Sequence, residues 1–230
     1  MTDRLPLRAE GLHRFYRRGG SEVAALLDVS LTCSPGETVA VTGPSGSGKS
    51  TLLGLLAGLD DPDGGRVTIY GERLSHLSDR QAALMRGRHI GVLTQASGLL
   101  GHLDVLANVQ LAESLRRTSG RAPGAAPGAE ELIERLGLSA VRRARPATLS
   151  GGETARAGLA VALAGGPDVL LADEPTAEVS ADEEVTVLDL LAEWRPAGGA
   201  TVLVTHSAVV AGRADRVVAL RDGRVVGAAA

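Results

Sequence analysis

The chain has 230 residues, 44% of them hydrophobic, so it can bury the core of one domain, with or without subdomains. Its formal net charge of −3 excludes an overall positive field that would recruit nucleic acid. Cys33 is the single cysteine, which excludes an internal disulfide and suits a reducing compartment. The sequence shows no signal peptide and no apolar stretch long enough to span a bilayer. We therefore expect a soluble chain that does not insert into a membrane and reaches one only through another subunit.

The first half of the chain alternates between strand and helix patterns. Two β-like runs, residues 7–16 and 23–32, are followed by the turn signal Ser34-Pro35-Gly36. Beyond this turn the pattern predicts, in order, a strand at 37–42, a helix at 50–58, a strand at 66–70, a helix capped by Ser78 and Asp79 that runs to about Arg88, and a strand at 90–95.

The second half begins with a helical region, at about 104–165, that is interrupted by a Pro- and Gly-rich loop at 118–128. After it we expect a strand at 169–173, a helix at 181–195, a strand at 200–206, a short helix, a strand at 216–220 and a hairpin turn at 221–224. This order predicts an α/β fold. Its mostly parallel sheet has helices on both faces and a helical insertion between the two halves of the sheet.

The stretch GPSGSGKST, residues 43–51, fits the phosphate-binding P-loop pattern and lies between a predicted strand and a predicted helix. Lys49 is the only lysine among 24 basic residues, which suggests a site that needs a compact ammonium. The alternative is a plain Gly/Ser-rich turn before a helix. The P-loop interpretation assigns nucleotide phosphates to Gly43, Ser45, Gly46, Ser47, Gly48, Lys49, Ser50 and Thr51, with Ser50 also holding Mg²⁺.

Two acids follow the apolar run at 169–172, which reads as a buried strand. Asp173 ends this strand and is placed to hold Mg²⁺, and Glu174 follows it as the candidate general base. Acids at a strand end are weak evidence alone, but a P-loop in the same chain strengthens the interpretation.

The stretch LSGGE, residues 149–153, resembles the signature motif of ABC ATPases. It places Ser150, Gly151 and Gly152 at a helix N-terminus, which is a second anion site; a capped helix start is the simpler alternative. The resemblance covers nearly the whole chain. It implies that residues 43–51 are the Walker A loop and residues 170–176 the Walker B strand. It also implies that Tyr16 stacks on adenine, that Gln95 is the Q-loop residue, a ligand of the metal and of water, and that His206 is the switch histidine.

The resemblance implies a P-loop ATPase core with an N-terminal antiparallel β subdomain and an inserted helical subdomain. The β subdomain would take about 1–40 and 60–75, the core about 40–95 and 165–230, and the helical subdomain about 96–164. ATP and Mg²⁺ would bind between two chains arranged head to tail, so that Ser150, Gly151 and Gly152 reach the partner's ATP. Glu174, His206, Gln95 and Lys49 would carry hydrolysis.

Finer stretches resemble the subfamily that powers macrolide export and lipoprotein release. This likeness implies a transmembrane permease that contacts residues near 97–105, and a cytoplasmic location on the inner face of the membrane. The same subfamily includes an ATPase that signals through a membrane partner to cell-wall hydrolases, and the sequence does not separate these roles. A chromosome or repair ATPase is disfavoured, because the chain lacks a long heptad segment and a basic face.

Several positions keep a second interpretation. Tyr16 could pack in the core instead of stacking on a base. The arginine clusters at 14–18, 116–121 and 142–145 could face an anionic partner, although we expect a solvated face. Glu153 stands where the family often has Gln. Val179 and Ser180 stand where it usually has Leu-Asp, so the loop that links the two nucleotide sites is altered.

Overall fold

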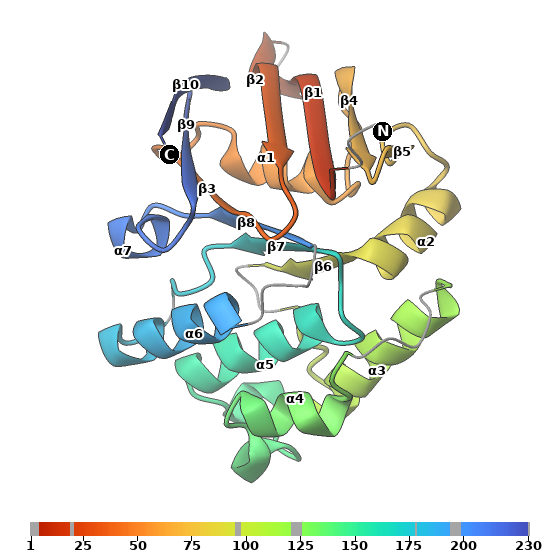
Figure 1. The fold of residues 1–230 in the computed structure, drawn as a ribbon, viewed down its shortest axis with the longest axis vertical. Coiled ribbons are helices and arrows are strands. Elements are labelled where there is room, and N and C mark those ends of the chain that lie inside the picture. Colours follow the sequence, from red (N-terminus) through yellow and green to blue (C-terminus); the bar gives the residue numbers. More distant parts are fainter. Residues whose placement is uncertain are drawn as a thin grey trace.

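The structure is a computed structural model that describes residues 5–18, 21–94, 98–120, 126–177, 179–193 and 199–229. The strands in these ranges form two sheets (Figure 1). The first sheet is antiparallel and has the order β2-β1-β4-β5. Its strands are β1 (Leu7–Arg18), β2 (Ser21–Cys33), β4 (Gly64–Ile69) and β5 (Glu72–Arg73).

The second sheet has the order β10-β9-β3-β8-β7-β6 and is parallel except for the β9–β10 hairpin. Its strands are β3 (Thr38–Thr42), β6 (Ile90–Leu93), β7 (Val169–Asp173), β8 (Ala200–Val204), β9 (Arg216–Arg221) and β10 (Arg224–Ala229). Because parallel strands end at a common edge, the loops that follow β3, β7 and β8 meet there. The predicted α/β fold is confirmed.

Helices cover both faces of the second sheet (Figure 1). Helix α1 lies between the two sheets, and α3 to α6 lie on the opposite face. The helices are α1 (Lys49–Leu56), α2 (Asp79–His89), α3 (Val105–Thr118), α4 (Ala129–Arg135), α5 (Gly151–Leu163), α6 (Ala181–Glu193) and α7 (Ala208–Ala211). None of the helices in the described ranges is long and apolar enough to cross a membrane.

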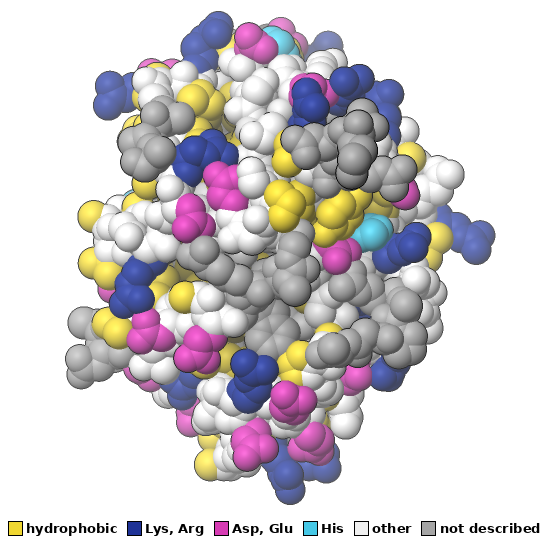
Figure 2. Space-filling model, viewed as in Figure 1, with side chains coloured by type: hydrophobic (Ala, Val, Ile, Leu, Met, Phe, Trp, Pro, Cys, Tyr) yellow, Lys and Arg dark blue, Asp and Glu magenta, His cyan; other side chains and the backbone are white. Residues whose placement is uncertain are grey.

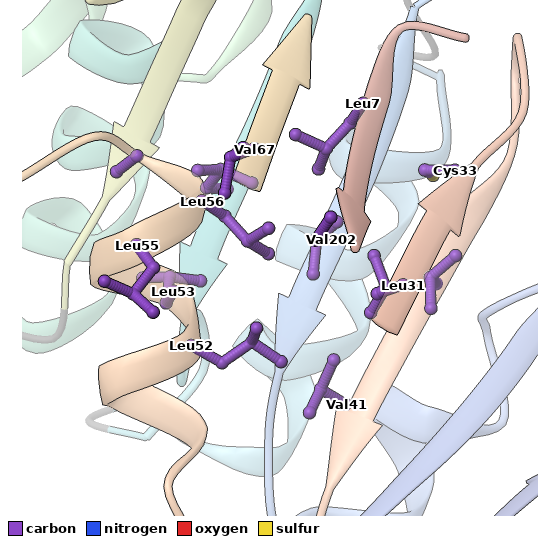
Figure 3. Close-up of a cluster of buried hydrophobic side chains, with 14 of the residues drawn as sticks. Leu7, Leu31, Cys33, Val41, Leu52, Leu53, Leu55, Leu56, Val67 and Val202 are labelled. Atoms are coloured by element: carbon purple, nitrogen blue, oxygen red, sulfur yellow. The ribbon is translucent and has the colours of Figure 1, made fainter. Parts of the chain in front are cut away.

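Two hydrophobic clusters occupy the two faces of the second sheet. Side chains alternate along a strand, so Val169 and Leu171 of β7 join the cluster with α1 and the first sheet, whereas Leu170 and Ala172 join the cluster with the helical region. Figure 3 shows the first cluster, in which the leucines of α1 point toward side chains of both sheets. The leucines are Leu52, Leu53, Leu55 and Leu56, all buried.

The predicted end of one strand was wrong. The strand expected at 90–95 ends at Leu93, because its pairing with β7 ends where Leu93 meets Ala172. Gln95, the Q-loop prediction, lies outside the described residues.

Arginines in all three clusters pair with acidic side chains: Arg14 with Asp60 at 2.8 Å and Arg117 with Glu113 at 2.8 Å. Arg142 pairs with Glu130 at 3.7 Å and Arg143 with Asp104 at 3.3 Å. Basic and acidic side chains also alternate over the helical region in Figure 2. The predicted solvated face was wrong for Arg116, whose residue surface is only 6% exposed.

Arg116 joins three elements of the helical region and the sheet. Its guanidinium donates to the carbonyls of Ala164 (2.6 Å) and Ala162 (3.4 Å) at the C-terminal end of α5, and to Ile90 (3.1 Å) at the start of β6. The last carbonyls of a helix lack partners within the helix, and a cation there also interacts favourably with the helix dipole. Arg116 therefore fixes α3 and α5 against β6.

We predict that Arg116→Ala lowers the free energy of unfolding by about 2–4 kcal/mol, because buried carbonyls lose a charged donor. Arg117→Ala is the matched control: the Arg117 side chain is 57% exposed and pairs with Glu113, so its loss should cost less than about 1 kcal/mol. Urea unfolding of both variants checks the prediction, and equal losses would contradict it.

Candidate functional site

The phosphate loop, residues 43–51, is held by close backbone packing. Gly48 has φ 104°, and a Cβ there would collide with the carbonyl oxygen of Ala25. A Cβ at Gly43 would collide with the carbonyl oxygen of Leu220 and would lie 2.8 Å from Ser47 Oγ. Only glycine fits such approaches without strain. Close contacts with β2 and β9 therefore require glycine at Gly43 and Gly48, two of the positions in the sequence motif.

The N-terminus of α1 is open to an anion. Gly48 precedes the helix and supplies no side-chain cap, and the first turn carries no acidic residue. Its first backbone N–H groups and the helix dipole therefore favour a negative ligand. Lys49 Nζ donates to the carbonyls of Gly43 (2.8 Å) and Pro44 (3.1 Å), so the ammonium lies over the loop.

Asp173 ends β7 and faces the loop. Burial raises the pKa of Asp173 above its ordinary value of 3.8; a hydrogen bond with Ser50 and the charge of Lys49 act against this rise, and the charge of Glu174 adds to it. Ser50 and Asp173 are both oxygen donors, which suit Mg²⁺. Within the described ranges no three His, Cys, Asp or Glu side chains form a metal cluster.

Glu174 and His206 are in direct contact. His206 follows β8, and its Nδ1–H donates to Glu174 Oε1 at 2.7 Å. The other carboxylate oxygen of Glu174 accepts from Thr205 Oγ1 at 3.1 Å. Glu174 has φ 47°, a conformation that is unusual for a residue with a side chain and is typical of functional sites.

These elements line one cleft of about 680 Å³. Among the described residues it is bordered by Asp173, Glu174, His206 and the predicted loop residues Gly43, Ser45, Gly46, Gly48, Lys49, Ser50 and Thr51. Pro44, Ala177 and four residues of the β1–β2 hairpin complete it: Tyr16, Val23, Ala24 and Ala25. Tyr16 is 40% exposed, so it does not pack in the core. Ser47 is buried beneath the loop, and Ser47 Oγ has no hydrogen-bond partner among the described residues.

The signature residues start a helix, as the sequence predicted, but they do not border the cleft of their own chain. Ser150 caps α5, its Oγ accepting from the Glu153 N–H at 3.2 Å, and Glu153 accepts from the Ser150 N–H at 2.8 Å. This reciprocal pair is a capping box. Glu153 therefore caps α5, a role that Gln81 fills in the capping box of α2.

Ser180 also has a local role. Its carbonyl accepts the first helical hydrogen bond of α6, from Glu184 at 2.8 Å, and its hydroxyl donates to Glu183 at 3.0 Å. A side-chain carboxylate oxygen of Glu183 in turn lies against Gly152, where a Cβ would collide with it. The altered loop at Val179 and Ser180 is thus tied to the signature helix within one chain.

Sequence reasoning missed two residues that position the catalytic candidates. Thr205 is buried and holds Glu174. Glu184 accepts from Thr176 at 3.0 Å and from Ser207 at 3.3 Å, joining the loops after β7 and β8. Only Thr205 carried a sequence signal, since it directly precedes the predicted switch residue His206.

The fold and the cleft define a P-loop nucleotide-binding protein. Residues 26–177 match the family described as ABC transporter. A macrolide export ATP-binding/permease protein, MacB of Rhodopseudomonas palustris (strain HaA2), is 42% identical over 220 residues, which are 96% of this chain and 33% of the relative. A probable syringafactin export ATP-binding/permease protein, SyfD of Pseudomonas syringae pv. syringae (strain B728a), is 38% identical, with the same coverage of each chain.

A solved structure of the ATP-binding cassette MJ0796, a post-hydrolysis dimer bound to ADP and Pi, matches with a TM-score of 0.88 and 32% identity over 97% of each chain. The chain belongs to the ABC transporter family. It spans about a third of the length of the curated relatives it matches.

We predict that Asp173→Asn raises the melting temperature of the nucleotide-free protein by about 2–4 °C at neutral pH, because it removes a partly buried charge beside Glu174. A carboxyl with a raised folded pKa destabilises the folded state once it is ionised. The gain should therefore be present above the folded pKa and vanish as the pH falls toward the ordinary value of 3.8.

The control is Asp189→Asn on α6, where the side chain is 54% exposed and pairs with Arg213 at 2.7 Å. It should give no gain at any pH. A melting temperature of Asp173→Asn that stays at or below wild type across the pH range would contradict the prediction.

Proposed function

We propose that this chain hydrolyses MgATP as a dimer and thereby drives a membrane permease that exports its substrate. The observation that carries the proposal is the cleft that brings Lys49, Ser50, Asp173, Glu174 and His206 together. The export names of the relatives favour export over lipoprotein release and over signalling to cell-wall hydrolases.

In this proposal the phosphates of ATP lie on the loop at 43–51. The N–H groups at the start of α1 and the ammonium of Lys49 offset phosphate charge, an electrostatic form of catalysis. Ser50 and Asp173 would hold Mg²⁺, which when bound neutralises charge on the phosphate oxygens. Gln95, which lies outside the described residues, stays a predicted ligand of the metal and of water.

Glu174 serves as the general base. Water attacks the γ-phosphorus, its proton passes to the Glu174 carboxylate, and the bond between the γ-phosphorus and the bridging oxygen of ADP breaks. His206 and Thr205 orient that carboxylate through the hydrogen bonds described above. His206 has a side chain 73% exposed, so it is free to reach the γ-phosphate as well.

The active unit is two chains arranged head to tail, a homodimer or a pair with a second ATPase. Ser150, Gly151 and Gly152 start a helix outside the cleft of their own chain, and we assign these three residues to the ATP of the partner chain. The MJ0796 cassette is dimeric in its solved structures, which supports a dimer here. Tyr16 would stack on the adenine of the ATP bound to its own loop.

The loop before α3 is proposed to receive the permease and so to keep the chain on the cytoplasmic face of the membrane. Asn108, 4% exposed, fixes this loop: its amide accepts from the Leu100 N–H at 2.8 Å and donates to the Asp104 carbonyl at 2.9 Å. Leu100 itself is 42% exposed and offers apolar surface to a partner.

The test is Glu174→Gln. Removal of the proton acceptor should slow hydrolysis by about 10²–10⁴-fold while ATP and Mg²⁺ still bind, so that a dimer accumulates. Steady-state hydrolysis and size-exclusion chromatography with MgATP measure both effects. Glu130→Gln, at a side chain 63% exposed on α4, is the control and should match wild type.

A Glu174→Gln protein that binds MgATP but stays monomeric, also with its permease present, would contradict the composite site. Hydrolysis close to the wild-type rate would contradict the role of Glu174 as the base.

A further inference from the structure

We propose that Arg14 and Asp60 are positioning residues for the nucleotide base, and that they act by fixing the ring of Tyr16. The inference rests on the proposed function, in which Tyr16 stacks on the base. Neither residue borders the cleft, so both would act through Tyr16.

The ring of Tyr16 is held at two places. The guanidinium carbon of Arg14 lies over the ring, 4.8 Å from its centroid, in cation–π geometry. The phenolic hydroxyl of Tyr16 donates to Asp60 Oδ2 at 3.0 Å. Tyr16 borders the cleft and is 40% exposed, so a base in the cleft would meet a ring that Arg14 and Asp60 hold in place.

Arg14 is itself fixed by the same carboxylate. Its Nε donates to Asp60 Oδ2 at 3.0 Å and its Nη2 to Asp60 Oδ1 at 2.8 Å. A two-point bond of this kind sets the orientation of the guanidinium plane as well as its position. The Arg14 side chain is only 20% exposed, so solvent screens the pair less than it would screen a surface ion pair.

Asp60 connects this arrangement to the phosphate loop. It follows the C-terminus of α1, whose N-terminus begins in that loop, and the four buried leucines of α1 hold the helix in place. One packed helix therefore sets the separation between the ring that receives the base and the N–H groups that receive the phosphates. A site ordered before binding loses less entropy when the nucleotide binds.

The neighbouring residue Asp63 already joins β1 to the turn after α1. Asp63 accepts from the Phe15 N–H at 2.7 Å, and the Asp63 N–H donates to the carbonyl of His13 at 2.8 Å. These two bonds join β1 to the turn after α1 without Arg14. Arg14 also donates to Asp63 Oδ1 at 3.3 Å and so strengthens this link. What the bond between Arg14 and Asp60 adds to it is contact with the Tyr16 ring and hydroxyl.

The experiment measures the dissociation constants of ATP and of inorganic tripolyphosphate, both with Mg²⁺, for the full chain. Arg14→Gln, Asp60→Asn and Tyr16→Phe should each weaken ATP binding about threefold to tenfold and leave tripolyphosphate binding unchanged. KM for ATP should rise while kcat at saturating ATP stays constant. Arg66→Gln, which breaks an exposed ion pair with Glu10 in the same sheet, is the control and should change neither constant.

A double-mutant cycle separates positioning from stability. In a Tyr16→Ala background, Arg14→Gln should have no further effect on ATP binding, because the group it acts through is gone. An equal loss in both backgrounds, or an equal loss for tripolyphosphate, would overturn the inference. If Tyr16→Ala leaves ATP affinity unchanged, the base site in the proposed function is wrong; if it weakens ATP and Arg14→Gln does not, only the present inference is wrong.

Discussion

The packing of α1 between the two sheets is the constraint on which the site depends. Its buried leucines fix an eight-residue helix whose two ends have different tasks. The N-terminal end presents N–H groups to phosphate, and the turn after the C-terminal end carries Asp60, which holds Arg14 and Tyr16. A helix of this length has little stability of its own. The burial of its apolar side chains is therefore what gives the phosphate loop and the proposed base site a fixed separation.

The second feature of the site is a concentration of negative charge before any phosphate binds. Asp173 and Glu174 are adjacent at the end of β7, and burial raises the pKa of Asp173. Glu174 adopts a positive φ that puts its carboxylate against Thr205 and His206. Both features cost stability, as expected where a fold is organised for catalysis. A cation and the ammonium of Lys49 would relieve the repulsion, so binding and stability are coupled here.

The sequence predicted those parts of the site that are encoded locally. The phosphate loop, the acids after β7 and the cap of α5 each occupy one short stretch whose spacing has a physical meaning, as in the capping pair of Ser150 and Glu153. The coverage of β7 by side-chain clusters on both faces also follows from pattern, because a fully apolar strand must be covered on both faces.

Contacts between distant segments could not be predicted in this way. Arg14 and Asp60 are 46 residues apart, and their pairing depends on the register of β1 against β4 and on the length of α1. From the sequence we expected Arg116 to lie on the surface, as Arg117 does. In the structure Arg116 is buried and Arg117, the next residue of α3, is exposed. The link from Ser180 through Glu183 to Gly152 likewise needs the packing of α6 against α5.

The central claim is that one chain's phosphate loop works with another chain's signature helix, and a mixing experiment tests it most directly. Lys49→Ala disables the loop and Gly151→Asp disables the signature, so each variant alone should be inactive. In a head-to-tail dimer of the two variants, one site holds both defects and the other holds none. We therefore expect the mixture, assembled on the permease, to recover part of the wild-type ATP hydrolysis. A mixture that forms dimers but stays as inactive as its components would contradict the account.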